Sequence, residues 1–241
     1  NVALKIFSKG TLTVERIQRI KREVIKGRSL SHKNLLKYYD VFEEDKYLII
    51  SMELIEGKTV EELIEEKEFK EEEIKDFLKE VIEALDYIHK KGIIHRDIKP
   101  SNVFLKEDGT YVLGDLGIIY LDEDDPLTRT KEIVGTLPYI PPDAFEKKFT
   151  PSYDYYSLGI TIYEVVPRDL PFKGTEAEII KGHHFKEPPK IKKNISKSLR
   201  KLINGLLIKK PEKRWGYYQI KKYIEGRPLP FLPKEKRNFL Y

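Results

Sequence analysis

Cysteine is absent from the 241 residues of the chain, and methionine and tryptophan occur once each. Without cysteine the chain can form neither a disulfide nor a thiolate metal site, which fits a reducing compartment and favours a cytoplasmic location. No apolar run approaches the ~20 residues with which an α-helix crosses a bilayer. No signal peptide is visible either. We therefore expect a cytoplasmic protein that inserts no part of this segment into a membrane.

A strong excess of one sign of charge is also missing. The chain has 45 Lys and Arg residues against 40 Asp and Glu residues, so its formal net charge is only +5. A balance this modest predicts no nucleic-acid partner. Apolar residues make up 40% of the chain, which is enough for one large domain or for two small lobes. The composition does not indicate an oligomeric state.

The first part of the chain alternates apolar segments with charged ones. Residues 2–7, 36–43 and 47–53 are typical of strands. Residues 13–26 are charged with apolar residues interspersed among them, which suggests a helix. This part is therefore expected to form a small, mostly β unit that carries one helix.

After Gly57 the pattern becomes helical. Thr59 followed by Glu62 is a capping-box pattern that opens a helix, and apolar residues recur at helical spacing from Ile74 to Ile88. We predict an α+β fold of two lobes, and ligands often bind where two lobes meet. The expected boundaries are a small N-lobe over residues 1–53, a hinge over 54–58, a helical C-lobe over 59–227 and a C-terminal tail over 228–241.

The stretch IIHRDIKPSNVFL, residues 93–105, places polar chemistry inside an apolar frame. A polar turn, a metal site and a catalytic loop are three interpretations of it. Asp97 could accept a proton from a hydroxyl group, and Lys99 could neutralise a phosphate. The amide oxygen of Asn102 suits Mg²⁺, and Asp115 in VLGDLGII offers a second oxygen ligand.

HRDIKPSN followed by DLG resembles the catalytic loop and the metal-binding loop of eukaryotic-type serine/threonine protein kinases, including bacterial ones. The resemblance runs from residue 2 to about residue 220. It implies a protein-kinase-like fold of two lobes and a transferase that uses ATP and Mg²⁺ to phosphorylate serine or threonine hydroxyls of proteins. Lys99 together with Gly135 and Thr136 is the serine/threonine pattern.

The resemblance also implies roles for single residues of the N-lobe. VALK resembles the strand that carries the phosphate-binding lysine, which makes Lys5 that lysine and Glu23 its partner. The resemblance makes Met52 the gatekeeper of the ATP site, and it makes Glu53, Leu54 and Ile55 the hinge. Ala3 and Phe104 would cover the two faces of the adenine ring.

In the C-lobe the resemblance makes Asp97 the catalytic base and Lys99 the lysine that contacts the transferred phosphate. Asn102 and Asp115 become the Mg²⁺ ligands, and Thr136 would bridge Asp97 and Lys99. The physical reason for such an assembly is phosphoryl transfer, in which catalysis consists mostly of positioning and charge stabilisation.

Three residues of the C-lobe are expected to brace the site. Asp154 in DYYSLG would anchor the backbone of the catalytic loop, and Arg214 would pair with Asp143. Three single residues depart from the family pattern, two in the C-lobe and one in the N-lobe. Asp143 is one methylene shorter than the usual glutamate, and Tyr156 stands where tryptophan is common. Gly27 stands where a bulky apolar residue is usual, which is expected to loosen the helix that carries the partner of the phosphate-binding lysine.

A regulatory phosphate is a further implication of the resemblance. Arg96 would receive a phosphate carried by Thr128 or Thr130, which stand seven and five residues before Gly135. Such a phosphate adds a charge of about −2 and can order a loop. Glu132 could instead supply a permanent negative charge three residues before Gly135.

The family's glycine-rich loop does not precede VALK, and we expect the residues that carry it to lie before residue 1 of this sequence. The alternative to an enzyme is a pseudokinase, an ATP-binding or scaffolding module that transfers phosphate poorly. The intact Lys5, Asp97, Asn102 and Asp115 favour the enzyme, whereas the missing glycine-rich loop and Gly27 favour the pseudokinase. A kinase that acts on a small molecule is a third class, and the segment GTLPYIPPD speaks against it because it resembles a peptide-docking loop. Among the histidines, His95 is expected to be structural, and His183 and His184 are expected to form a surface pair.

Overall fold

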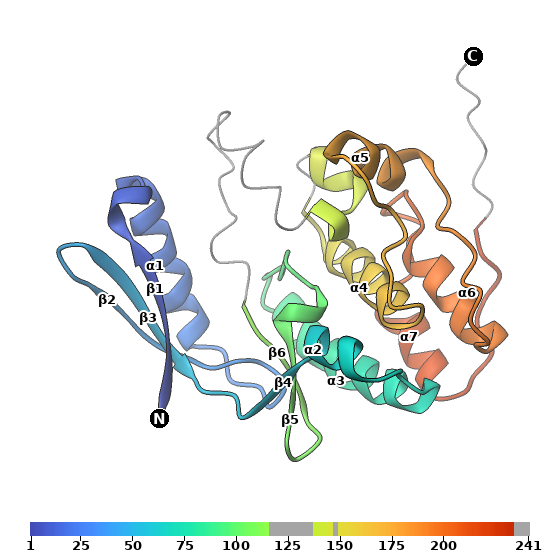
Figure 1. Ribbon diagram of the computed structural model, residues 1–241, viewed down its shortest axis with the longest axis horizontal. Coiled ribbons are helices and arrows are strands. Elements are labelled where there is room, and N and C mark those ends of the chain that lie inside the picture. The colour runs from blue at the N-terminus through green and yellow to red at the C-terminus, as the bar shows by residue number, and fades with distance from the viewer. Residues whose placement is uncertain (116–136, 147–148, 234–241) are drawn as a thin grey trace.

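The computed structural model of the chain describes residues 1–115, 137–146 and 149–233. A small lobe with a sheet and one helix lies beside a larger helical lobe (Figure 1). The α+β fold of two lobes expected from the sequence is therefore confirmed. No helix within the described ranges is both long and apolar enough to cross a membrane.

The small lobe is a three-stranded sheet in which β3 lies between β1 and β2 and pairs antiparallel with both. Helix α1 lies alongside this sheet (Figure 1). It begins after Thr13, whose side chain accepts a hydrogen bond from the backbone N–H of Arg16. The elements of this lobe are β1 (Val2–Ser8), α1 (Val14–Arg28), β2 (Tyr38–Glu43) and β3 (Tyr47–Glu53).

Gly27 of α1 does not leave a gap in the small lobe. The ring of Tyr38 on β2 packs against it so closely that a Cβ atom on Gly27 would lie 3.2 Å from the ring. Tyr38 belongs to the core cluster of this lobe together with Ile20 and Val24 of α1. The loosening of α1 expected at Gly27 is therefore not observed, because the tyrosine fills the space.

The segment between α1 and β2 is attached to the larger lobe. The backbone N–H of Leu36 donates to the carbonyl of Leu113 at 2.9 Å, and the N–H of Leu113 donates to the carbonyl of Asn34 at 2.9 Å. The buried side chain of Asn34 also donates to the carbonyl of Tyr111 at 2.8 Å. The two lobes are thus joined at this segment as well as at the hinge, and this second connection limits how they can move.

The larger lobe is built from helices and a small sheet with the strand order β4-β5-β6. Thr59 and Glu62 form the predicted capping box at the start of α2. The elements are β4 (Gly57–Thr59), α2 (Val60–Glu66), α3 (Glu71–His89), β5 (Val103–Lys106), β6 (Tyr111–Leu113), α4 (Pro151–Val165), α5 (Glu176–Phe185), α6 (Lys197–Leu206) and α7 (Tyr217–Ile224).

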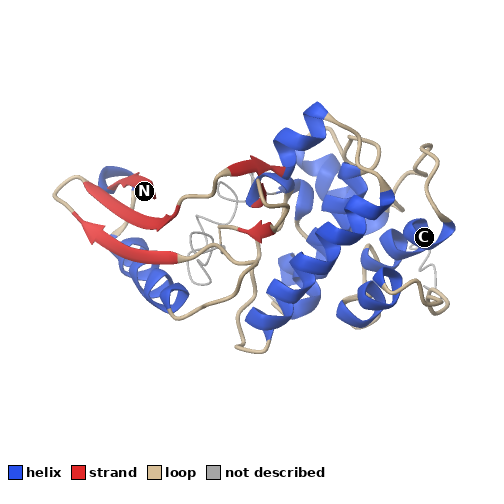
Figure 2. Ribbon diagram, turned by 90° about the horizontal axis from the view of Figure 1, so that it is seen from below, coloured by secondary structure: helices blue, strands red, loops and turns tan. Residues whose placement is uncertain are grey.

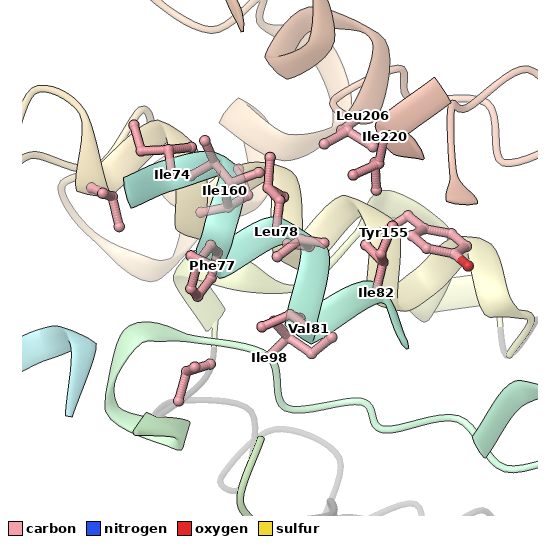
Figure 3. Packing of buried hydrophobic residues seen from close by; sticks show 14 of the residues in the cluster. Ile74, Phe77, Leu78, Val81, Ile82, Ile98, Tyr155, Ile160, Leu206 and Ile220 are labelled. Carbon is pink, nitrogen blue, oxygen red and sulfur yellow. The ribbon is translucent and has the colours of Figure 1, made fainter. Parts of the chain in front are cut away.

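Helices make up most of this lobe (Figure 2), and α3 and α4 contribute many of its buried residues. The apolar stripe of α3 faces side chains from α4, α6 and α7, among them Tyr155, Leu206 and Ile220 (Figure 3). Almost every residue of α4 is buried, so this helix is fixed on all sides. A helix buried all round is a rigid support for whatever is attached to its ends.

A polar contact at the start of α3 joins three helices. The carboxylate of Glu71 accepts hydrogen bonds from the backbone N–H of Ser196 at 3.1 Å, from the hydroxyl of Ser196 and from the hydroxyl of Tyr223 at 2.7 Å. Partial burial favours the neutral carboxyl, but these hydrogen bonds outweigh it and lower the pKa of Glu71. The charged form of Glu71 is therefore more favourable in the folded chain than in the unfolded one.

We expect Glu71→Gln to lower the free energy of unfolding by about 1 kcal/mol at neutral pH, because an amide offers one acceptor oxygen in place of two. A lowered folded pKa stabilises the fold above the unfolded pKa, and this contribution is lost as the pH falls through the folded pKa. The difference between variant and wild type should therefore shrink below about pH 4 in urea titrations. Glu72→Gln, an exposed neighbour, is the control, and equal losses in both variants would contradict the assignment.

Candidate functional site

Residues 93–105, which the sequence predicts to be the catalytic loop, are held by a buried carboxylate on the first turn of α4. Asp154 accepts hydrogen bonds from the backbone N–H groups of His95 at 2.9 Å and Arg96 at 2.8 Å. Its carboxylate also bonds Nε2 of His89 on α3 at 2.7 Å. These contacts hold Arg96 at a φ of 67°, a conformation that costs a non-glycine residue about 1–3 kcal/mol. Asp154 lies where the sequence led us to expect it.

His89 is a part of this anchor that the sequence did not reveal. It is the last residue of α3 and follows a regular apolar stripe, so it resembles the end of any amphipathic helix. Its ring stacks edge-on against Tyr155 with centroids 5.5 Å apart. The sequence did offer one signal for this role, because His89 is a polar residue at the end of a buried helix and shortly before the predicted catalytic loop.

Asp97, Lys99 and Asn102 form one hydrogen-bonded group. The side-chain amide of Asn102 donates to the carbonyl of Asp97 at 2.8 Å and to its Oδ2 at 2.7 Å. The ammonium of Lys99 lies 3.0 Å from the same Oδ2. The Asp97 side chain is only 4% exposed, and its Oδ1 has no hydrogen-bond partner among the described residues. This buried oxygen therefore has acceptor sites that no described residue uses.

His95 connects the catalytic loop with the strand that leads to Asp115. Its Nδ1 accepts from the N–H of Asp97 at 3.3 Å, so its Nε2 carries the proton and donates to the carbonyl of Gly114 at 2.9 Å. Burial lowers the pKa of His95, which keeps the ring neutral. The structural role expected for His95 fits these contacts.

Lys5 and Asp115 meet between the lobes. The ammonium of Lys5 on β1 lies 2.9 Å and 2.8 Å from the two carboxylate oxygens of Asp115. Asp115 has a φ of 44°, so this residue too is held in an unusual backbone conformation. The two side chains are 31% and 39% exposed, so a ligand entering between the lobes can reach both.

The expected pair of Lys5 with Glu23 is not the one that forms. The carboxylate of Glu23 bonds Lys26, three residues further along α1, at 3.2 Å, while Lys5 bonds Asp115. Asp115 offers both of its oxygens to Lys5, and Lys26 is a nearer cation for Glu23 on its own helix. Exposed pairs of this kind contribute about 0–1 kcal/mol, so little free energy separates the two arrangements.

The residues expected around the adenine come from both lobes. Ala3 lies on β1 opposite Met52 on β3, and Phe104 lies on β5 opposite Val112. Gly114 leaves room for the Phe104 ring, because a Cβ atom on this glycine would lie 2.7 Å from it. A larger residue at position 114 would therefore displace the Phe104 ring.

The hinge follows β3. Met52 is buried, and the carboxylate of Glu53 forms an ion pair with Lys106 of β5 at 2.8 Å. This pair ties the end of the small-lobe sheet to the larger lobe. Leu54 is exposed, while Ile55 packs against the core of the small lobe.

The donor set fits a metal ion bound together with phosphates and not by the protein alone. Among the described residues no cluster of three or more His, Cys, Asp or Glu side chains could hold a metal. Asn102 uses its nitrogen in both of its hydrogen bonds, which leaves its oxygen for a cation. With the carboxylate of Asp115 this makes two oxygen ligands. Mg²⁺ is usually bound by one or two such groups, water and substrate phosphates.

Asp143 and Arg214 form the expected pair below the site. The guanidinium lies 3.3 Å from Oδ2 of Asp143 and also donates to the carbonyl groups of Ile208 at 2.8 Å, Lys209 at 2.9 Å and Ser152 at 2.9 Å. The shorter aspartate is therefore sufficient. Burial without this many partners would be costly for a charged group.

Arg96 points its guanidinium over the ring of Phe149, with Cζ 4.2 Å from the ring centre. Thr128, Thr130 and Thr136 lie outside the described residues. The expected surface pair of histidines is wrong for His183, whose exposure is 1%. Its ring is buried between α4 and Phe172, which no spacing pattern in the sequence indicated.

Comparison with known proteins identifies the family. The family model described as "Protein kinase domain" matches residues 1–224. The chain belongs to this family. It is 35% identical over 93% of its length to a probable serine/threonine-protein kinase of Clostridium perfringens, and it covers 33% of that protein. It is 34% identical over 92% of its length to an Aurora kinase of Schizosaccharomyces pombe and covers 63% of it.

A third relative is 3-phosphoinositide-dependent protein kinase 1 of Arabidopsis thaliana, with 32% identity over 89% of the chain and 46% of the relative. The chain thus spans between about a third and two thirds of the length of these curated relatives. The matched region of the chain includes every element of the site described above.

Replacing Asp154 tests the anchor of the catalytic loop. We expect Asp154→Asn to lower the free energy of unfolding by about 3 kcal/mol, because two buried backbone N–H groups lose a charged acceptor. Hydrogen exchange at His95 and Arg96 should accelerate more than exchange in α6. Asp169→Asn, which removes an exposed carboxylate, is the matched control. Unchanged exchange at the loop would show that Asp154 does not hold it.

Proposed function

We propose that the chain is the catalytic domain of a serine/threonine protein kinase, which transfers the γ-phosphate of ATP to protein hydroxyls in the cytoplasm with the help of Mg²⁺. The observation that carries the proposal is the arrangement of Asp97. Its buried carboxylate is held by Lys99 and Asn102 on one oxygen, and the other oxygen has no partner within the described part of the chain. Membership of the protein kinase family and the names of the relatives support the same reaction.

Asp97 and Lys99 have different roles in the proposed phosphoryl transfer. A substrate hydroxyl donates its hydrogen bond to Oδ1 of Asp97, which orients the oxygen and accepts its proton. The bond between the γ-phosphorus and ADP breaks as the bond to the substrate oxygen forms. Lys99 lies close enough to Asp97 to contact both the attacking oxygen and the transferred phosphoryl group.

Charge on the nucleotide is met by residues from both lobes. Lys5 on β1 would contact the phosphates from the small lobe, and its pair with Asp115 brings the two lobes together at that point. Asp115 and Asn102 would hold Mg²⁺, which supplies positive charge next to the phosphates when bound. Serine and threonine are the proposed acceptors because of the loop HRDIKPSN and the names of the relatives.

Phosphate transfer is tested with labelled ATP, Mg²⁺ and dephosphorylated casein or myelin basic protein as generic substrates. Asp97→Asn should lower the rate by about 10²–10⁴-fold, because it removes the proton acceptor. Asp108→Asn, at an exposed turn, is the control and should keep the rate. Equal and negligible labelling by wild type and Asp97→Asn would contradict the proposal. ATP-dependent thermal stabilisation in that case would instead favour a pseudokinase.

We further propose that Thr128 or Thr130 is phosphorylated by the chain itself and that Arg96 receives the phosphate. Mass spectrometry after incubation with ATP should find phosphate on one or both, and none in Asp97→Asn. The Thr128→Ala, Thr130→Ala double variant should then be less active than wild type at equal ATP. If active wild type carries no phosphate at either threonine, the permanent charge of Glu132 becomes the better candidate.

A further inference from the structure

Lys106 of β5 holds both ends of the predicted hinge. On one side its ammonium forms the ion pair with Glu53 at 2.8 Å, and Glu53 is the last residue of β3 in the small lobe. On the other side its backbone lies opposite Gly57, the first residue of β4, where β4 pairs antiparallel with β5. Residues 54–56 therefore form a short loop whose two ends are both fastened to Lys106.

The two ends of this loop are fastened in different ways. At Gly57 the backbones of β4 and β5 are in close contact, because a Cβ atom on this glycine would lie 2.2 Å from the carbonyl oxygen of Leu105. The backbone N–H of Glu107 also donates to the carbonyl of Glu56 at 3.3 Å. At Glu53 the fastening is an ion pair between side chains. This end is thus the one that a change of charge or of salt concentration can release.

The ion pair lies next to the two residues expected to cover the adenine ring. Ala3 on β1 pairs with Met52, the neighbour of Glu53 on β3. Phe104 precedes Lys106 by two residues on β5. Residues two apart on a strand point to the same face, so Phe104 and Lys106 share a face of β5. The pair therefore fixes the spacing between the strand that carries Ala3 and the strand that carries Phe104.

We propose that Lys106 is a positioning residue for the adenine of ATP, because its ion pair with Glu53 sets the width of the adenine site. The proposal rests on the proposed function, which requires an adenine site between the lobes. A site that is already held at the correct width binds its ligand without first restricting the motion of the lobes. The side chains of Lys106 and Glu53 are 28% and 27% exposed, so salt should weaken the pair by screening.

Adenosine is the probe that tests the adenine site alone, because it carries no phosphate and does not need Mg²⁺. Lys106→Met removes the charge and keeps an unbranched apolar side chain. We expect the dissociation constant for adenosine to rise about fivefold in calorimetry, and KM for ATP to rise by the same factor with kcat within about twofold of wild type. Lys106→Arg keeps the charge, so it should bind adenosine as wild type does.

Lys193→Met is the matched control for the loss of a lysine charge. Lys193 forms an ion pair of the same length, 2.8 Å, with Glu68, and its side chain is 29% exposed, but both of these residues belong to the larger lobe. Adenosine binding by this variant should equal that of wild type. A loss as large as that of Lys106→Met would show a general effect of charge and overturn the proposal. Wild-type affinity in Lys106→Met would overturn it as well.

The salt dependence of adenosine binding is a second measurement, and wild type itself carries it. Raising the ionic strength from about 0.1 M to about 1 M shortens the range of electrostatic interactions from about 10 Å to about 3 Å. Adenosine binding by wild type should weaken about threefold relative to binding by Lys106→Met. An equal salt dependence of the two proteins would contradict the proposal, and so would a wild type that does not bind adenosine.

Failure of the proposed function would look different. A wild type whose adenosine binding depends on Lys106 but that transfers no phosphate would contradict the kinase activity and support the positioning role. A wild type that transfers phosphate, with equal adenosine binding in Lys106→Met, would contradict the role of Lys106 alone. The failures of the two proposals are thus distinguishable.

Discussion

The contact between Asp154 and the catalytic loop is the interaction on which the site depends. A buried carboxylate is costly unless its oxygens are satisfied, and here two of its donors are consecutive backbone N–H groups of the loop, those of His95 and Arg96. The loop therefore cannot leave without exposing a buried charge to an apolar interior. Asp154 belongs to α4, which is buried on all sides. The loop is therefore attached to a rigid part of the core. Asp97 is the next residue, so its direction is set by the same contact.

The charged groups of the site neutralise one another in two separate pairs. Lys5 lies on Asp115 at the opening between the lobes, where both side chains are partly exposed. Lys99 lies on Asp97 in a buried position. An exposed pair contributes about 0–1 kcal/mol, so in the proposed reaction phosphates would separate Lys5 from Asp115 at little cost. The buried pair is harder to separate, which would keep Lys99 next to Asp97 when a nucleotide binds or leaves.

The sequence predicted most of this architecture because its signals are local. The strands, the capping box at Thr59 and the apolar stripe of α3 follow from period and capping, which depend on neighbouring residues. The pair of Asp143 with Arg214 could be expected from family motifs. The partner of Lys5 and the burial of His183 could not, because each depends on which of several distant groups lies nearest after folding.

Three departures from the family pattern are each matched by a neighbour in the fold. Gly27 is matched by the Tyr38 ring. Asp143 is matched by Arg214, which also donates to three backbone carbonyl groups. The hydroxyl of Tyr156 is matched by Nδ1 of His183, which lies 2.9 Å away. A close-packed interior tolerates a change of volume or polarity only where a contacting residue compensates. Each departure taken alone suggests a fold that has lost a contact needed for activity. The contacts indicate instead that a neighbouring residue restores the packing or the hydrogen bonding at each position. On this physical ground the enzyme is favoured over a degenerate copy of it.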